Sequence, residues 1–416
     1  MLIEKKIAFL PLRVSLIFLV FTEVLVLIGP FDYDITNHFL LYSYLVVLNI
    51  AFYLGYKRGV LKFKPSVFNF SQRVLAVFLI IGFLLTFRKM YFMWSRRGLE
   101  LSLYSVLYAL SNSGDVYKNT VEVEQVFSST FWDLLTPFKW AAIPLGIGNW
   151  KKISKSLRVI VVLTIIMEAL AWLGIGTRKG LLDIILITVF VSFSTNSQLI
   201  LDSKKRKKTI LISSIVIVAF LFYFTISGAS RRGYMVSELN TIEVVQDIKP
   251  SYEKVPDGLL YSFCSIESYL CQGYYALSKG LELGIRPITF GGSGWYTIMI
   301  MRKFGYDPEP GIYMVPLEQF GIDRHINWHS IYLWFANDVT FVGVPIIIFL
   351  IGYLFAISWQ DVLYGRNQAA LPFFALMLIM VFYFYANNQV MSFSFVPLVF
   401  WSLFYFITRR NYKTTL

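Results

Sequence analysis

Long apolar stretches separated by short polar ones dominate this 416-residue chain. A membrane-crossing helix needs about 20 mostly apolar residues, and about ten stretches come near that length. They lie near residues 7–29, 38–56, 74–88, 129–149, 157–175, 180–198, 209–227, 330–357, 369–387 and 390–408. The alternating polar and apolar runs typical of outer-membrane strands are absent. The pattern therefore predicts an all-α polytopic membrane protein.

Two segments between these stretches are long enough to fold outside the membrane. One lies near 89–128 and the other covers 228–329. In the longer segment, "DGLLYSFCSIESYLCQGYYALSKGLELG" has apolar residues at helical spacing behind Asp257, a candidate N-cap, and "GGSGWYTIMIMRKFG" predicts a shorter helix. We expect both helices to lie on the membrane surface. The predicted organisation is a first set of helices in 1–227, a large outer loop at 228–329, and the last helices with a tail in 330–416.

Composition agrees with this interpretation, since 56% of the residues are hydrophobic and 15% are charged. The net charge of +13 could indicate nucleic acid, but the basic residues are gathered in clusters such as "YKRGVLKFK", "KKISKSLR", "KKRKK" and "RRNYK". With a cytoplasmic N-terminus these clusters all fall on the cytoplasmic side, where positive charge is typical. We therefore place both termini in the cytoplasm. Anionic lipid headgroups suffice as partners for the clusters, and no nucleic-acid binding is expected.

The only cysteines, Cys264 and Cys271, fall in the large outer loop. If that segment is helical, they lie on one face but two turns apart, roughly 10 Å by the helix rise. That separation is too long for a disulfide. We expect two free, buried thiols, with a disulfide only if the stretch is not helical.

Five arginines are predicted on the outer side of the membrane, although basic residues are usually concentrated on the cytoplasmic side. They are Arg178, Arg231, Arg232, Arg286 and Arg324. All are predicted at the outer face beside small residues or proline, where backbone can approach a ligand closely. Guanidinium groups bind phosphate through paired, permanently charged donors, so the set is a candidate pyrophosphate site. The alternative is that these arginines contact lipid phosphates or pair with outer acids such as Glu238 and Asp323.

Two of the three histidines, His325 and His329, lie in "DRHINWHSIYLWFANDV", where an apolar span is about to begin. A zinc site would need a third ligand, and neither an HExxH motif nor a Cys/His set is present. We expect no metal and no cofactor. A histidine at a helix end often only satisfies hydrogen bonds, but imidazole also suits general-base work near neutrality. His329, His325 and Asp338 are therefore the catalytic candidates.

Other polar and aromatic residues have open roles. Glu23, Glu168 and Asp183 fall inside apolar stretches and should have partners, because a buried charge is expensive there. Asp183 is expected to pair with Arg178, and Glu168 could be structural or part of a proton route. Several rings near the outer polar residues could stack on sugars or belong to an interfacial belt: Trp295, Tyr296, Trp328, Tyr332 and Trp334.

Two blocks resemble the O-antigen and capsule repeat-unit polymerases of the Wzy type. "NWHSIYLWFANDVTFVGVPIIIFLIG" is similar to the family block in which Asn and small hydroxyl residues precede aromatic residues, Asp, a glycine and an apolar span. "GIGTRKGLLDIILI" is similar to the Gly-Thr/Ser-Arg block after an earlier span. The residues that match are Arg178, Asn327, Asp338 and Gly343. Thr340 departs from the family pattern, which usually has glycine there.

The resemblance implies a GT-C-like helical glycosyltransferase of the bacterial inner membrane with a periplasmic active site. It would transfer a growing glycan from undecaprenyl pyrophosphate to the next lipid-linked repeat unit, with a flippase and a chain-length regulator as further partners. Adding our own candidates, the expected pyrophosphate and glycan contacts are Arg178, Arg231, Arg232, Arg286, Arg324, Asn327 and Tyr332. Three alternatives stay open: an O-antigen ligase acting on the lipid A core, a polysaccharide flippase, and a non-catalytic membrane scaffold.

Overall fold

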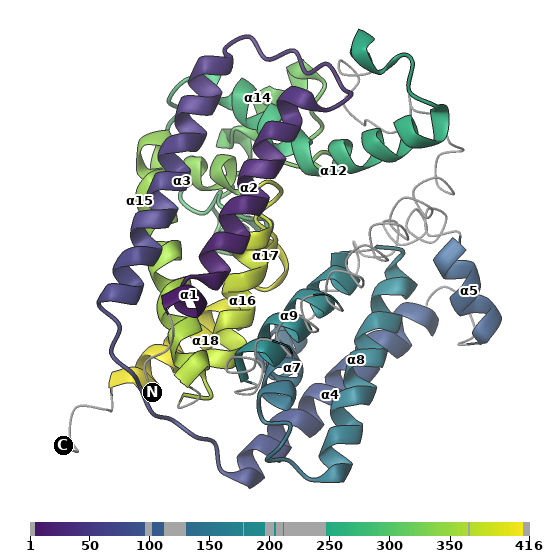
Figure 1. Ribbon diagram of the computed structural model, residues 1–416, viewed down its shortest axis with the longest axis vertical. Coiled ribbons are helices and arrows are strands. Elements are labelled where there is room, and N and C mark those ends of the chain that lie inside the picture. The colour runs from purple at the N-terminus through teal and green to yellow at the C-terminus, as the bar shows by residue number, and fades with distance from the viewer. Residues whose placement is uncertain are drawn as a thin grey trace. The chain divides into compact units, whose positions relative to one another are not determined.

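The computed structural model is all-α over the part of the chain that it describes (Figure 1). It describes residues 5–95, 102–111, 130–177, 179–195, 204, 211, 247–364 and 367–410. Extended pairing in these ranges is limited to two isolated bridges, Phe31 with Ile248 and Phe68 with Asn367. The predicted helical class is therefore confirmed for the described residues.

The chain divides into two compact units. The first comprises residues 1–63, 234–357 and 379–395. Its helices are α1 (Lys5–Ala8), α2 (Leu10–Ile28), α3 (His38–Leu61), α12 (Asp257–Glu282), α13 (Trp295–Lys303), α14 (Met314–Leu317), α17 (Gln389–Phe393) and most of α15 (Ile331–Tyr364). Three short 3-10 turns, η2 (Pro250–Tyr252), η3 (Glu309–Gly311) and η4 (Glu318–Phe320), join them.

The second unit comprises residues 64–233, 358–378 and 396–416. Its described helices are α4 (Gln72–Ser95), α5 (Leu103–Ser111), α7 (Thr130–Gly148), α8 (Lys155–Ile175) and α9 (Lys179–Thr195), with most of α16 (Ala370–Phe382) and α18 (Phe395–Arg410). The last turns of α15 also belong to it.

Five described helices are long and apolar enough to cross a membrane: α2, α3, α4, α8 and α15. Helices α16 and α18 are apolar but shorter. These helices match seven of the ten stretches expected from the sequence and support a multi-pass membrane protein. The stretch at 209–227 lies outside the described residues apart from Leu211.

The core of the first unit depends on close backbone approach between α3 and α15. A Cβ on Gly55 would lie 1.9 Å from the carbonyl oxygen of Phe349, and one on Gly352 would lie 2.5 Å from that of Phe52. Only glycine allows the two helices to come this near. The contact fixes the position of α15, which carries the residues described below.

Helix α12 is more enclosed by protein than the surface helix that we expected. It packs against α2 and α3, as Figure 1 shows, and side chains such as Glu267, Cys271 and Tyr274 are fully buried. Asp257 is its first residue and makes no side-chain cap, because Pro256 holds the N-cap position. The two cysteines are free and buried, as predicted.

The second unit is built from α4, α7, α8 and α9. A Cβ on Gly82 of α4 would lie 2.9 Å from the Phe138 carbonyl oxygen, and one on Gly146 of α7 would lie 2.4 Å from Val161 of α8. Small residues at such crossings let apolar helices pack closely where water does not drive them together. This packing holds three charged residues, Lys89, Lys139 and Glu168, inside the unit.

Candidate functional site

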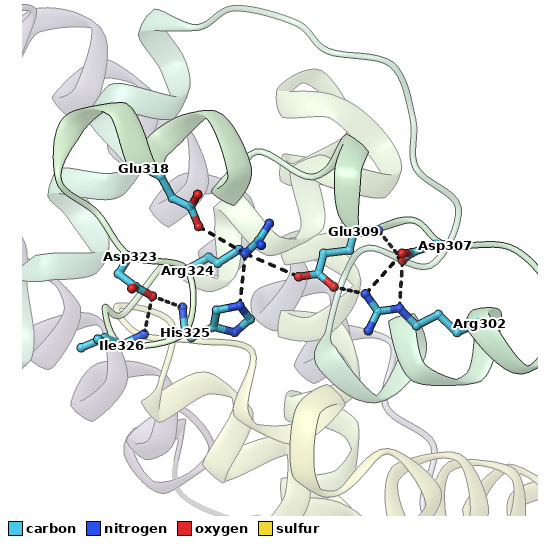
Figure 2. A network of polar contacts seen from close by, with 8 residues as sticks. All are labelled: Arg302, Asp307, Glu309, Glu318, Asp323, Arg324, His325 and Ile326. Carbon is cyan, nitrogen blue, oxygen red and sulfur yellow. Dashed lines mark hydrogen bonds and ion pairs between the residues drawn. The ribbon is translucent and has the colours of Figure 1, made fainter. Parts of the chain in front are cut away.

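A network of ion pairs organises the segment between α13 and α15 (Figure 2). The guanidinium of Arg302 pairs with Asp307 at 3.0 Å and also with Glu309. Nε of Arg324 lies 3.5 Å from Glu309 and 3.2 Å from Glu318. Arg324 therefore pairs with acids, as the alternative interpretation had it, although the partners are Glu309 and Glu318 and not Asp323.

Asp323 and Asn327 shape the turn that carries His325. One carboxylate oxygen of Asp323 accepts the backbone N–H of His325 at 2.6 Å and that of Ile326 at 3.1 Å. The side-chain oxygen of Asn327 accepts the Asp323 N–H at 2.6 Å. Such side-chain bonds to nearby backbone are typical of turns. The structure thus places Asn327, a predicted ligand contact, in a buried position that holds the backbone.

A row of aromatic rings leads from the exposed His325 to the buried His329. Nε of Arg324 donates to Nε2 of His325 at 3.1 Å, and the His325 ring stacks on Trp295 with centroids 5.4 Å apart. Trp295 meets Trp334 edge to face at 5.2 Å, and Trp334 meets His329 at 6.4 Å. The two histidines are therefore linked through tryptophans and do not form a metal pair with each other.

His329 is a fully buried imidazole. Neither ring nitrogen has a hydrogen-bond partner of ordinary geometry among the described residues. Burial lowers the pKa of His329 to about 4, and the nearby Asn327 backbone and Asp323 charge offset only part of that effect. The ring is consequently neutral at pH 7, which is the form in which an imidazole can accept a proton.

Asp338 is engaged by a loop that is distant in sequence. Its Oδ1 accepts from the Thr289 hydroxyl at 3.0 Å, the Gly291 N–H at 2.8 Å and the Gly292 N–H at 2.9 Å. Its Oδ2 accepts the N–H and the hydroxyl of Ser293, at 3.1 and 2.5 Å. Five hydrogen bonds to one carboxylate make Asp338 an anchor for this loop, which leads directly to Trp295.

The neighbouring Asn337 completes the anchor. Its side-chain N–H donates to the Gly292 carbonyl at 2.9 Å, and its side-chain oxygen accepts the Tyr313 N–H at 2.8 Å. Its backbone carbonyl accepts the Thr289 N–H at 2.9 Å. The 289–293 loop and the short connection between η3 and α14 are thus both attached to the same turn of α15.

Helix α15 is interrupted directly after this anchor. Thr340 has φ 57° and ψ 169°, so two helical segments meet there at a kink. This backbone region is almost restricted to glycine, and a residue with a Cβ is strained there by about 1–3 kcal/mol. Glycine, which the resembling polymerases usually have here, would carry no such strain. Gly343, by contrast, lies in regular helix, packed under Val339.

The remaining predicted contacts are distributed over several places. Tyr332 is 1% exposed and meets the Phe384 ring at 5.7 Å, so it is a core residue. Arg286 is half-buried, and its backbone N–H donates to the Tyr313 hydroxyl at 3.0 Å. The Nε atom of its side chain is buried without a hydrogen-bond partner among the described residues. Arg178, Arg231 and Arg232 lie outside the described residues.

The turn around Arg178 can be followed through its neighbours. Helix α8 ends at Gly176, whose φ of 74° needs glycine, and the Thr177 N–H bonds back to the Trp172 carbonyl. A Cβ on Gly180 would lie 2.0 Å from the Trp172 ring. Asp183 pairs with Lys179 at 2.5 Å. Two of the three glycines of "GIGTRKG", Gly176 and Gly180, are thus explained by the structure.

The acids expected to need partners inside the spans have them. Glu23 accepts two hydrogen bonds from the Asn49 side chain, at 2.8 and 3.0 Å. Glu168 pairs with both Lys89 and Lys139 at 3.1 Å. These pairings agree with the cost of burying a charge in an apolar environment.

Asn387 is a site residue that the sequence reasoning missed. Its side-chain oxygen accepts the His329 N–H at 2.7 Å and the indole N–H of Trp334 at 3.2 Å. The neighbouring Asn388 donates to the Ser293 carbonyl at 2.8 Å. The only signal in the sequence is the polar triplet "NNQ" between two apolar stretches.

Metal-ligating residues do not cluster in the described ranges, where no group of three or more His, Cys, Asp and Glu side chains could hold an ion. Asp32 and Asp34 form a DxD pair in the sequence, but Asp34 faces the ammonium of Lys279 at 3.2 Å.

Comparisons with known protein families, curated proteins and solved structures find no match to this chain.

Proposed function

We propose that this protein is a membrane glycosyltransferase that polymerises lipid-linked oligosaccharide repeat units. The donor would be a glycan on undecaprenyl pyrophosphate, and the acceptor would be the next lipid-linked unit at the periplasmic face of the inner membrane. The proposal rests on the resemblance of two sequence blocks, and one observation in the first unit supports it.

That observation is the buried, neutral His329 at the end of an aromatic row. Neither ring nitrogen makes a hydrogen bond of ordinary geometry with a described residue. The half-buried Trp295 stacks on the exposed His325 at the outer end of this row, and an indole of this kind could also stack on a sugar, while Trp334 is fully buried between Trp295 and His329. A sugar hydroxyl that reached His329 would meet a base in its proton-accepting form.

The proposal assigns distinct roles to the predicted residues. His329 is the candidate base, and His325 lies at the entrance of the aromatic row. Asp338 and Asn327 are positioning residues, because their side chains hold the 289–293 loop and the 323–327 turn. Arg178, Arg231 and Arg232 keep the proposed role of binding the pyrophosphate, for which paired guanidinium donors are suited.

The leaving group defines what the arginines must do. Breaking the bond between the sugar and the pyrophosphate leaves the negative charge on the lipid pyrophosphate, while the acceptor oxygen forms the new bond and loses its proton to the base. Fixed positive groups near the leaving oxygen stabilise this charge as it develops. Arg178→Lys tests the point, because it keeps the charge but removes the paired donor geometry.

The experiment uses purified full-length protein with a lipid-linked repeat unit as sole substrate, in the presence of EDTA. Products are resolved as a ladder on a gel and by mass spectrometry. We expect a ladder of added repeats, a loss of at least a hundredfold in rate for His329→Gln, and a comparable loss for Arg178→Lys. His38→Gln is the matched control, since the third histidine is exposed and stacks only on Tyr42.

Two outcomes would overturn the proposal. Transfer of the glycan to a lipid A core, with no ladder, would identify a ligase. Movement of the repeat unit across the bilayer of a proteoliposome, without new glycosidic bonds, would identify a transporter. A wild-type rate in His329→Gln within an intact ladder would remove the base assignment alone.

A further inference from the structure

We propose that the connections on either side of α13 insert apolar side chains into the lipid bilayer. Five exposed side chains form what we call the apolar patch: Ile285, Ile288, Phe290, Phe304 and Tyr306. The two phenylalanines are 68% and 82% exposed. Exposed apolar patches mark contacts with membranes or other proteins. The partner that this patch fits is the leaflet around the first turns of α15, and the inference does not rest on the proposed polymerase activity.

Two sharp turns bring the patch together, although α13 separates them in the sequence. The Tyr306 hydroxyl donates to the Thr289 carbonyl at 2.6 Å, so the turn after α13 lies beside the segment that precedes it. Phe290 has φ 49° and Gly305 has φ 83°. Residues with a Cβ rarely adopt such a backbone. The fold therefore holds Phe290 in an unfavourable conformation in which its ring is exposed.

The attachment of the patch to α15 places it beside the span. Gly291 and Gly292, which follow Phe290, donate to Asp338 as described above. Asp338 comes seven positions after Ile331, where α15 begins, which is about 10 Å along the helix axis. An exposed apolar stripe of α15 starts soon after this point and consists of Val342, Ile346 and Leu350. The patch thus continues the surface that α15 offers to lipid.

Helix α3 indicates the same depth. The Tyr44 hydroxyl donates to the Phe341 carbonyl at 2.8 Å, which places Tyr44 near the level where the patch is attached. The helix begins earlier, at His38, and Phe39 in its first turn is already 84% exposed. Exposed apolar side chains of a membrane-crossing helix face lipid. The level of the patch therefore falls within the apolar part of α3.

The backbone before α13 is suited to an apolar environment. Pro287 has no N–H group that would need a partner. The N–H groups of Arg286, Thr289 and Gly291 donate to protein acceptors over 3.0, 2.9 and 2.8 Å. Irregular backbone is tolerated at membrane depth only where the protein satisfies its polar groups. Lipid can therefore contact the apolar side chains without leaving these donors unpaired.

The charged neighbours of the patch fit the level of the lipid headgroups. Asp307 follows Tyr306 but pairs with Arg302 at 3.0 Å, so it brings no isolated negative charge to the bilayer. Arg286 is half-buried. A long basic side chain can keep its stem in apolar surroundings while its charged end reaches the headgroups. Aromatic and basic residues together are typical of this interface.

The test measures the surroundings of single nitroxide labels on the full-length protein in nanodiscs. Phe290→Cys and Phe304→Cys carry the label in the patch, and Val342→Cys carries it on the lipid-facing stripe. Gln319→Cys, at an exposed polar position of η4, is the aqueous control. The two native cysteines are buried and should remain unlabelled. Power-saturation EPR compares collisions with oxygen, which concentrates in lipid, and with a charge-neutral nickel chelate, which stays in water.

We expect the logarithm of the oxygen-to-nickel collision ratio to be positive at both patch positions, as at Val342→Cys, and negative at Gln319→Cys. Phe304→Cys keeps the test valid if a replacement of Phe290 disturbs its strained turn. Negative values at the patch positions would place them in water and overturn the inference. Low accessibility to both reagents, with dipolar broadening between labels on two copies, would identify a contact between copies of the chain and would also overturn it.

Discussion

Both carboxylate oxygens of Asp338 are occupied by hydrogen bonds from one loop, and Ser293 alone contributes two of them through its N–H and its hydroxyl. The two residues are 45 positions apart in the sequence. The loop that they connect to α15 places Trp295 against Trp334. Asp338 therefore determines the geometry of the aromatic row without being part of it.

Replacement of Asp338 should lower stability. Hydrogen bonds to a charged group contribute about 1.5–3 kcal/mol each, and removing several at once leaves buried donors unsatisfied. We expect Asp338→Ala to lose at least about 3 kcal/mol, measured by thermal unfolding in detergent. Asp307→Asn is the control, since that acid lies in an exposed pair with Arg302. Equal losses for both variants would contradict the anchoring role.

Thr340→Gly should raise stability. Glycine removes the strain of the φ 57° backbone but adds conformational freedom to the unfolded chain, and the balance is a gain of about 1 kcal/mol. Thr340→Ala retains a Cβ and should give no gain. Thermal unfolding of the two variants side by side checks this result, and a loss of stability in Thr340→Gly would show that the threonine side chain contributes more than its strain costs.

His329 should make the protein sensitive to acid. Its pKa falls from 6.5 in the unfolded chain to about 4 in the folded one because the ring is buried. Between these values the unfolded chain binds more protons than the folded chain. The contribution of the neutral His329 to the free energy of unfolding is therefore fully present above pH 6.5 and is lost as the pH falls towards 4. The difference corresponds to about 3 kcal/mol.

Unfolding measured between pH 4 and 7 checks this expectation. His329→Phe should flatten the pH dependence in that range, whereas His38→Phe, at an exposed position, should leave it as in the wild type. A pH profile that His329→Phe does not change would show that the acid sensitivity comes from other groups.

Glu267 should have the opposite pH dependence. Burial raises the pKa of its carboxyl from 4.5 to about 8, and the hydrogen bond from the Phe31 N–H offsets part of the shift. The folded chain thus holds a proton that the unfolded chain releases between these values. The contribution of the protonated Glu267 to the free energy of unfolding is fully present below pH 4.5 and is lost as the pH rises through about 8. Glu267→Gln should remove this loss in alkaline unfolding experiments, while Glu253→Gln, on an exposed turn, should not.

Much of the helical architecture could be predicted from the sequence because apolar length and periodicity are local properties. The start of α3 at His38 and the extent of α12 follow directly from them. Helix α4 extends to Ser95, well beyond the predicted end at 88, because Glu168 and the Trp172 ring stabilise Lys89 inside the unit. A charge that ends an apolar stretch in the sequence therefore need not end the helix.

The candidate site could be predicted only in part. The sequence singled out His329 and Asp338, but their partners Asn387 and Ser293 are 58 and 45 residues away. Such pairings depend on how the helices pack, and no local pattern encodes them. Arg324 shows the same limit, since its partners Glu309 and Glu318 come from two separate 3-10 turns, η3 and η4.

The buried thiols of α12 have a practical consequence. Cys264 and Cys271 both have 0% exposure, and burial raises the pKa of the Cys264 thiol to about 12, so neither forms a reactive thiolate at neutral pH. Maleimide reagents should leave the native chain unlabelled. Single cysteines introduced into the polar connections can then be assigned to one side of the bilayer in an otherwise wild-type background, and unmasking of the two native thiols reports unfolding of the first unit.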